Sequence, residues 1–186
     1  CDWSSDVCSS DLVDRHPDRL KLAKSIGAIT IDDSKVSPVD FLMKETRDLG
    51  VDRGCECVGY QAHDAEGDEQ PDMTMNSLIG SVKATGGIGV VGVFVPEDPQ
   101  AEDPLQKKGK LALDFGKLWF KGQTVRTGQC NVKHYNRELC NLIHNERANP
   151  SFIVSHELDL DKAPEAYERF DKREMGWTKV ILHPGN

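Results

Sequence analysis

The stretch VDRHPDRLKLAKSIGAITI, residues 13–31, decides the fold class of this chain. Its first residues end a short strand, and Pro17 stands where the first turn of a helix favours proline, because that position needs no amide hydrogen. Apolar residues follow at helical spacing, and Gly27 is placed to end the helix. The apolar run of residues 28–31 then predicts a second strand. A strand, a helix and a strand in this order are typical of parallel pairing through a crossover helix.

The same alternation continues downstream. A helix predicted over residues 39–49, with Gly50 as its left-handed cap, precedes the strand CECVGY, residues 55–60. A helix over residues 75–85, closed by two glycines, precedes IGVVGVF, residues 88–94, which reads as the most clearly buried strand. The later segments predict a polar loop (61–72), a Pro- and charge-rich loop (96–110), a short helix or turn (LDFGKLWFKG), a strand (QTVRTGQ), an amphipathic helix (HYNRELCNLIHNERA) and a closing strand, helix and strand (FIVSHELDL, APEAYERF, TKVILHP).

The fold class expected from this order is α/β, with a doubly wound parallel sheet. Residues 1–12, CDWSSDVCSSDL, do not fit the pattern, since they are polar, rich in serine and contain the near-duplicates SSDV and SSDL. They stand where a first apolar strand and a glycine-rich turn are expected. We therefore expect residues 1–12 to be non-native or disordered and unpaired, and the sheet to lack its first strand and glycine turn.

Composition excludes several function classes. The 186 residues include 23 Lys and Arg against 31 Asp and Glu, a net charge of −8, which disfavours a surface that tracks nucleic-acid phosphates. No apolar run approaches the roughly 18 residues that cross a bilayer, and the first residues lack the order of a signal peptide. The sequence thus predicts no nucleic-acid partner, no membrane partner and a cytoplasmic location.

Six cysteines are scattered without the paired spacing of a structural zinc site. Cys55 and Cys57 lie two apart, so they share one face of a strand. A tetrahedral site needs about two more ligands, so buried free thiols are favoured over a metal site. The histidines lack a nearby Cys or Glu at ligand spacing, and none of them is assigned to a metal: His134, His144, His156 and His183.

Asp14 is the first candidate for chemistry. An acidic residue at the end of the second strand of a dinucleotide-binding fold accepts hydrogen bonds from both adenosine ribose hydroxyls. The alternative is a solvated aspartate near a helix start, where the helix dipole favours negative charge. The residue by itself leaves both interpretations open.

Six segments, in order, resemble the glutathione-independent formaldehyde dehydrogenases and related formaldehyde dismutases of the zinc-dependent medium-chain alcohol dehydrogenase superfamily. They are VDRHPDRLKLAKSIGA, CECVGY, ATGGIGVVGVF, LDFGKLWFKG, TGQCNVKHYNREL and APEAYERFDKREMGWTKVILHP. The resemblance covers essentially everything after Leu12. The closing helix and strand mark only the superfamily, whereas the long loop after CECVGY and the TGQ and YNR segments indicate this branch.

The resemblance implies cofactor-binding roles for particular residues. Asp14 matches the ribose-binding carboxylate, and Arg19 an arginine near the adenosine end. Val58 matches an apolar residue beside the cofactor. His63 stands where the family has an arginine, and Ala65 where it has a histidine, so this loop departs from the family pattern as a cofactor contact.

Four later residues complete the predicted cofactor site. Val91 and Val93 match positions near the nicotinamide, and Gly128 and Cys130 match backbone contacts at the end of the next strand. Each has an ordinary alternative. Val58, Val91 and Val93 are also what the buried end of any strand contains, and Gly128 is also what a turn requires.

The resemblance further implies an NAD-dependent enzyme that oxidises small aldehydes or alcohols by hydride transfer, with zinc as Lewis acid. In the complete family the zinc ligands lie in a catalytic domain whose residues are not in this sequence, so no residue here is assigned as catalytic. Residues 13–150 are expected to form a partial dinucleotide-binding domain, and residues 151–186 a segment that returns to the catalytic domain. We expect weak NAD binding, no turnover by this chain alone, and a homo-oligomer for the complete protein.

Three alternatives stay open. A zinc-independent, NADPH-dependent reductase of the same superfamily is opposed by the charge of Asp14 towards a 2′-phosphate, although Arg15 beside it offers partial compensation. A methyltransferase that binds S-adenosylmethionine also uses an acidic residue after its second strand. A non-catalytic interaction module requires an exposed apolar patch.

Overall fold

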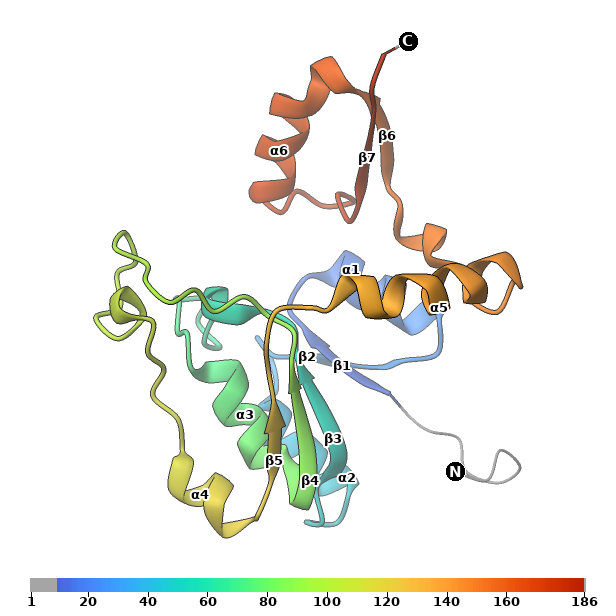
Figure 1. The fold of residues 1–186 in the computed structure, drawn as a ribbon. Helices are drawn as coiled ribbons and strands as arrows, with labels where there is room; N and C mark the ends of the chain where they lie inside the picture. The colour runs from blue at the N-terminus through green and yellow to red at the C-terminus, as the bar shows by residue number, and fades with distance from the viewer. Residues whose placement is uncertain (1–9, 186) are drawn as a thin grey trace. The chain divides into compact units, whose positions relative to one another are not determined.

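The computed structural model describes residues 10–185, which divide into two compact units. Among these residues, the first unit comprises residues 10–15 and Ile29–Cys130, and the second comprises His16–Ala28 and residues 131–185. Each unit combines parallel strands with helices (Figure 1). None of the helices between residues 10 and 185 has the length and apolar character needed to cross a membrane.

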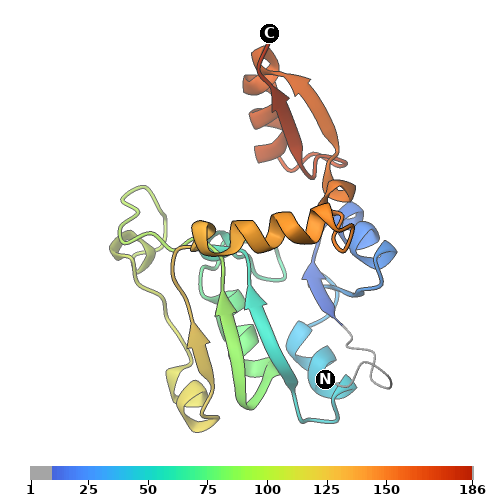
Figure 2. The same ribbon diagram turned by 45° about the vertical axis from the view of Figure 1, so that its right-hand side comes forward.

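The first unit holds two parallel sheets. In one, β1 (Asp11–Asp14) pairs with β2 (Ile29–Asp32), and in the other the strand order is β3 (Val51–Glu56), β4 (Val82–Val90), β5 (Thr124–Arg126). Figure 2 shows the strands of the second sheet side by side. The helical segments of this unit are α2 (Pro38–Glu45), η1 (Gly59–Gln61), α3 (Met73–Ser81), η2 (Gln106–Lys108) and α4 (Phe115–Phe120).

The division into two sheets matches a doubly wound sheet without its first strand. In that topology the first strand is central and separates the second strand from the fourth. Within the described residues β1 pairs with β2 alone and β3 with β4 alone, so each sheet ends at an edge where a central strand would lie. The predicted parallel α/β fold is confirmed.

One expectation about the first twelve residues is wrong. Asp11 pairs with Ile29 and Leu12 with Thr30, so both residues belong to a parallel strand instead of an unpaired tail. The hydrogen-bonding capacity of the main chain explains this, because it lets polar and apolar residues alike join a ladder. The part of the prediction that concerns residues 1–9 lies outside the described residues.

The ends of two strands and of one helix differ from those predicted from the sequence. β3 ends at Glu56, before the predicted residue 60, and β4 ends at Val90. Gly86, expected to help close a helix, lies inside β4, where an added Cβ would be 2.8 Å from the carbonyl oxygen of Asp52. Glycine is tolerated in a strand where another backbone approaches this closely.

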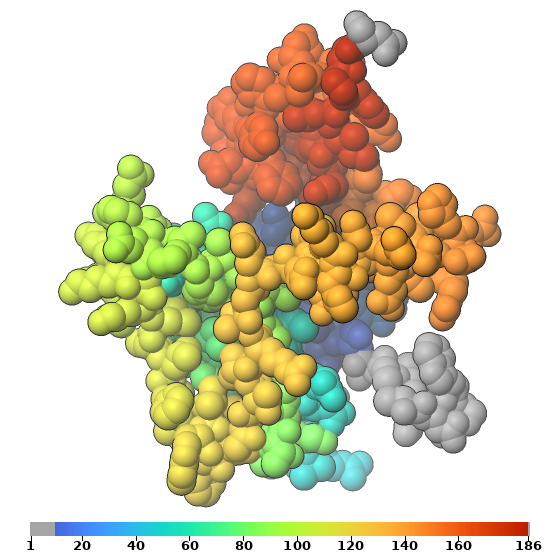
Figure 3. Space-filling model, in the orientation of Figure 1, coloured from blue at the N-terminus to red at the C-terminus, as the bar shows by residue number. Residues whose placement is uncertain are grey.

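The predicted helix over residues 39–49 also ends early. α2 stops at Glu45, and Leu49, expected on its inner face, is 75% exposed. Arg47 and Asp48 have φ angles of 53° and 62°, so the chain leaves the helix through left-handed conformations before Gly50, which has the expected positive φ of 83°. The Pro- and charge-rich loop after β4 lies on the surface, in yellow-green in Figure 3.

The core of the first unit forms between α3 and β4. Met75 and Ile79 from the helix pack with Val82 and Ile88 from the strand, and all four are buried. The last carbonyl groups of α3 accept hydrogen bonds from the side chain of Lys121, at 3.0 Å for Ile79. Burial, followed by the nearby Lys117, lowers the pKa of the Lys121 ammonium group.

The second unit contains α1 (Pro17–Ser25) and α5 (Val132–His144), followed by a β-α-β motif. Pro17 at the start of α1 and the positive φ of 93° at Gly27 agree with the predicted helix ends. β6 pairs with β7 in parallel, as the closing segments predict. The elements of the motif and its surroundings are η3 (Pro150–Ile153), β6 (His156–Asp159), η4 (Leu160–Lys162), α6 (Ala163–Asp171) and β7 (Val180–His183).

Candidate cofactor-binding edge

The predicted site residues of the first unit follow the carboxyl ends of its strands. Ligands of open parallel sheets bind at this edge, near the point where the strand order reverses. The register pairs Glu56 with Val90 and Gly89 with Arg126, so β3, β4 and β5 end at one level. The residues concerned are Asp14 at the end of β1, Val58 after β3, Val91 and Val93 after β4, and Gly128 and Cys130 after β5.

Three valines give this edge an apolar surface. Val58 is 49% exposed, Val91 67% and Val93 71%. The interpretation of these valines as buried core residues is therefore wrong, because the strands end before the chain reaches them. Exposed apolar side chains at the end of a parallel sheet provide a surface suited to an aromatic ring.

Glu56 organises the main chain beneath the valines. Its side chain is completely buried, and Oε1 accepts hydrogen bonds from the main-chain N–H groups of Val58 at 2.7 Å and Gly59 at 2.8 Å. Its carbonyl oxygen accepts from the N–H of Val91 at 2.8 Å. The second carboxylate oxygen, Oε2, is buried without a partner among the described residues. Glu56 was not selected from the sequence, although a carboxylate inside an apolar run was a usable signal.

Two glycines allow the turns after β3 and β4 to touch. A Cβ at Gly92 would lie 2.1 Å from Oε2 of Glu56. Gly59 has a φ of 78°, and a Cβ there would lie 2.5 Å from the carbonyl oxygen of Val93. Larger residues at either position would push the two turns apart.

The turn after β5 uses glycine for a different reason. Gly128 has a φ of 137°, a conformation that other residues rarely adopt, while an added Cβ would meet no atom within 4 Å. Cys130 is exposed two residues later. Main-chain groups at this turn are therefore open to solvent, as a backbone contact with a cofactor requires, and that role stays a prediction.

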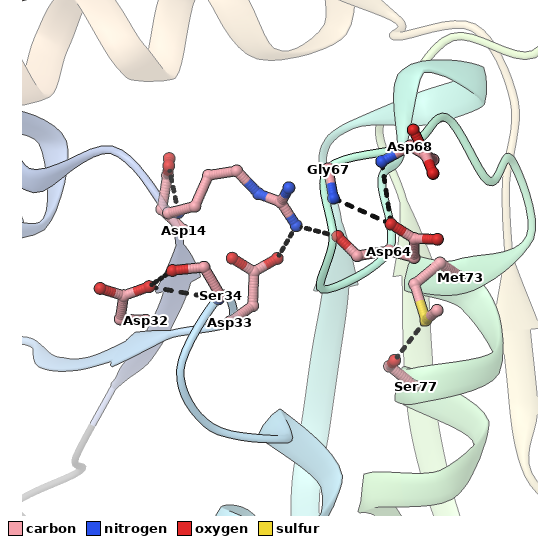
Figure 4. A network of polar contacts seen from close by, with 10 residues as sticks. Asp14, Asp32, Asp33, Ser34, Asp64, Gly67, Asp68, Met73 and Ser77 are labelled. Carbon is pink, nitrogen blue, oxygen red and sulfur yellow. Dashed lines mark hydrogen bonds and ion pairs between the residues drawn. The ribbon is translucent and has the colours of Figure 1, made fainter.

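Asp14 ends β1 as predicted and is half-buried. Its Oδ1 accepts a hydrogen bond from the main-chain N–H of Arg15 at 2.7 Å (Figure 4). Two further carboxylates lie at the end of β2, where Asp32 is the last residue of the strand and Asp33 follows it. The ammonium group of Lys35, helped by Ser34, holds the pKa of Asp32 below its usual value. The carboxyl ends of β1 and β2 thus present an acidic surface.

The polar loop of residues 61–72 is ordered by its own hydrogen bonds. Oδ1 of Asp64 accepts from the N–H groups of Gly67 and Asp68, both at 2.9 Å, and His63 forms an isolated antiparallel bridge with Glu69. His63 is therefore held within the loop, and its cofactor contact stays a prediction. Arg19 lies in α1, in the second unit, and its role stays a prediction as well.

The thiols differ from the expectation of buried strand residues. Cys55 and Cys57 are both exposed, because β3 is an edge strand that ends at Glu56. Burial, followed by the nearby Cys55 and Glu56, raises the pKa of the Cys57 thiol. Between residues 10 and 185 no three His, Cys, Asp or Glu side chains gather to hold a metal ion. We assign none of them to zinc.

Solved structures define the class of this fold. An alcohol dehydrogenase, TADH, from Thermus sp. ATN1 superposes with a TM-score of 0.78 and 30% identity, covering 96% of this chain and 46% of its own. A zinc dependent alcohol dehydrogenase 2 from Streptococcus pneumonia, at 23% identity and a TM-score of 0.75, shares the fold over 96% of this chain and 45% of its own. The chain thus has the fold of the zinc-type alcohol dehydrogenases.

Curated relatives narrow this class. A formaldehyde dismutase from Pseudomonas putida is 38% identical over 180 residues, which are 92% of this chain and 44% of that protein. A glutathione-independent formaldehyde dehydrogenase from Bacillus subtilis is 36% identical over 165 residues, 86% of this chain and 40% of that protein. No protein-family profile matches. The resemblance expected from the sequence is confirmed for the part covered, and the chain spans less than half the length of these relatives.

Proposed function

We propose that this chain is the cofactor-binding portion of an NAD-dependent, zinc-type alcohol or formaldehyde dehydrogenase that oxidises small aldehydes or alcohols. The observation that carries the proposal is the carboxyl edge of the first unit. There the exposed Val58, Val91 and Val93 stand at strand ends, and Asp14 ends β1. An acidic group for a ribose and an apolar surface for a ring are the two features that a nicotinamide dinucleotide requires.

Each side chain has a defined task in this proposal. The carboxylate of Asp14 accepts hydrogen bonds from the adenosine ribose hydroxyls. The valines exclude water from one face of the nicotinamide, and the open turn at Gly128 offers main-chain groups to its carboxamide. NAD, when bound, supplies the acceptor of the hydride. For the complete protein we propose a small-molecule substrate and a homo-oligomeric assembly.

Ligand-observed NMR on the 186-residue chain tests the proposal. Saturation transfer to NAD is expected at millimolar concentrations, and a charged residue in the variant Val91→Asp should weaken transfer to the nicotinamide protons. A matched control is Leu49→Asp, since Leu49 is also exposed, at 75%, but comes just before the amino end of β3. Transfer to S-adenosylmethionine without transfer to NAD would instead support a methyltransferase-like module.

A further inference from the structure

The guanidinium group of Arg15, directly after Asp14, is already engaged by other residues. Its Nη2 atom donates to Oδ2 of Asp33 at 3.1 Å and also to the carbonyl oxygen of Asp64. The pair is partly shielded from water, with side chains only 20% and 24% exposed for Arg15 and Asp33. The close view in Figure 4 shows Asp33 and Asp64 on either side of this contact.

Asp33 depends on Arg15 in return. Its other carboxylate oxygen, Oδ1, is buried and has no hydrogen-bond partner among the described residues. A shielded carboxylate with one unsatisfied oxygen gains most from a cation held in place, and separating the two leaves a charge without compensation. The ion pair with Asp33 therefore holds the Arg15 side chain in one position. A free arginine side chain would adopt many.

The neighbouring charges are paired in the same way. Lys35 Nζ lies 2.5 Å from Oδ2 of Asp32, so each of these two cations of the acidic surface has a carboxylate partner. A 2′-phosphate on the adenosine ribose needs an arginine or lysine whose donors are available. Arg15 is the cation that directly follows the ribose carboxylate, yet its Nη2 group is turned to Asp33 and Asp64.

We propose that Asp33 determines nucleotide selectivity by withholding Arg15 from a 2′-phosphate. The inference rests on the proposed binding of NAD at this edge. Asp33 acts through Arg15, so it is a positioning residue. Replacing Asp33 has two effects: it releases the guanidinium group beside Asp14, and it removes one negative charge. Only the release of the guanidinium group requires Arg15.

The test compares adenosine 5′-monophosphate with adenosine 2′,5′-bisphosphate, titrated into the ¹⁵N-labelled chain. Asp33→Ala should shift the affinity ratio towards the bisphosphate about tenfold, the size of one charged hydrogen bond. Adding Arg15→Leu to that variant should cancel the shift. Asp40→Ala, in α2, is the matched control, because it removes the same charge from the first unit and leaves the pairs Arg15–Asp33 and Lys35–Asp32 intact. If Asp33→Ala loses the dispersed spectrum of the folded chain, Asp33→Asn takes its place.

Three results overturn the inference while leaving the proposed function in place. They are an unchanged ratio with monophosphate still bound, a shift that persists without Arg15, and an equal shift in Asp40→Ala. Failure of both nucleotides to perturb any variant overturns the proposed function and this inference together.

Discussion

The two compact units are stabilised by different contacts. The first has an apolar cluster in which Ile79 and Val82 are completely buried. In the second, the buried apolar residues among those described are two alanines and Trp177. Trp177 stacks on His156 with ring centroids 3.8 Å apart, and the guanidinium carbon of Arg169 lies 5.3 Å from its ring centroid. Apolar burial thus dominates the first unit, while the second depends on a few aromatic and polar contacts.

The largest expected effect comes from the apolar cluster. Ile79→Ala removes a side chain with no exposed surface and should lower the free energy of unfolding by about 2–5 kcal/mol. Urea unfolding followed by circular dichroism measures it. Leu49→Ala, at a 75% exposed position, is the control and should cost less than about 0.5 kcal/mol. Equal costs for the two variants would show that α3 and β4 do not form the core.

Trp177→Phe should affect the second unit by a smaller amount. It shortens the ring that contacts His156 and Arg169, at an expected cost of about 1–2 kcal/mol. Hydrogen exchange should become faster for the amides of β6 and β7 and stay unchanged for β4. Trp119→Phe, where the residue is 73% exposed, is the matched control. Faster exchange in β4 would contradict the separate stabilisation of the two units.

Asp14→Asn should weaken binding without a comparable loss of stability. An amide accepts less strongly than a carboxylate and carries no charge, so the affinity for adenosine 5′-monophosphate should fall about tenfold. The ¹⁵N titration measures this loss. Asp40→Asn, in α2, should leave the affinity unchanged. A similar fall in both variants would mean that Asp14 acts only through the net charge of the first unit.

The second unit should show a weak acid dependence that the Asp18→Asn variant lacks. The N–H of Gly176 donates to Oδ2 of Asp18 at 2.8 Å, and this bond is the main cause that lowers the pKa of Asp18. The carboxylate therefore contributes its full stability above the unfolded pKa of about 3.9, and the contribution is lost as pH falls through the lower folded pKa. The expected difference is below about 1 kcal/mol. Identical unfolding free energies for both chains between pH 6 and 3 would contradict it.

The smallest expected effect is a difference between the alkylation rates of two cysteine thiols. The four described cysteines are exposed in both units, so all should react with iodoacetamide without unfolding. The raised pKa of Cys57 leaves less thiolate near neutral pH, so it should be alkylated more slowly than its neighbour Cys55. Timed digestion and mass spectrometry give both rates. Protection of Cys55 and Cys57 alike would restore the expectation of buried strand thiols.

Local signals in the sequence predicted both ends of α1. Pro17 and Gly27 bound α1 as expected, because each satisfies a conformational need of its own backbone. The strand ends were predicted less well. CECVGY and IGVVGVF look like buried strands, but their last residues continue beyond the paired ladder. Pairing depends on the neighbouring strand, which the local sequence does not contain.

The candidate site shows the same division. The resemblance placed Asp14 and the valines at strand ends, and the structure agrees. It did not indicate that the main-chain carbonyl of Glu56 accepts a hydrogen bond from the turn after β4, nor the contact of Arg15 with Asp33. Both contacts join residues that parallel pairing brings together. The type of a residue in the sequence does not show which residues will contact it in the fold.

The sequence by itself determined the order of strands and helices, the acidic residue at the end of β1 and the similarity to formaldehyde dehydrogenases and dismutases. Periodicity and helix-end residues act over a few positions, so they can be read along the chain. Only the tertiary structure decided that Val91 and Val93 are exposed, that Cys55 is not buried, and that Arg15 is held by Asp33. Exposure and ion pairing depend on which segments approach one another in space, and the chain reaches that arrangement only when its strands pair.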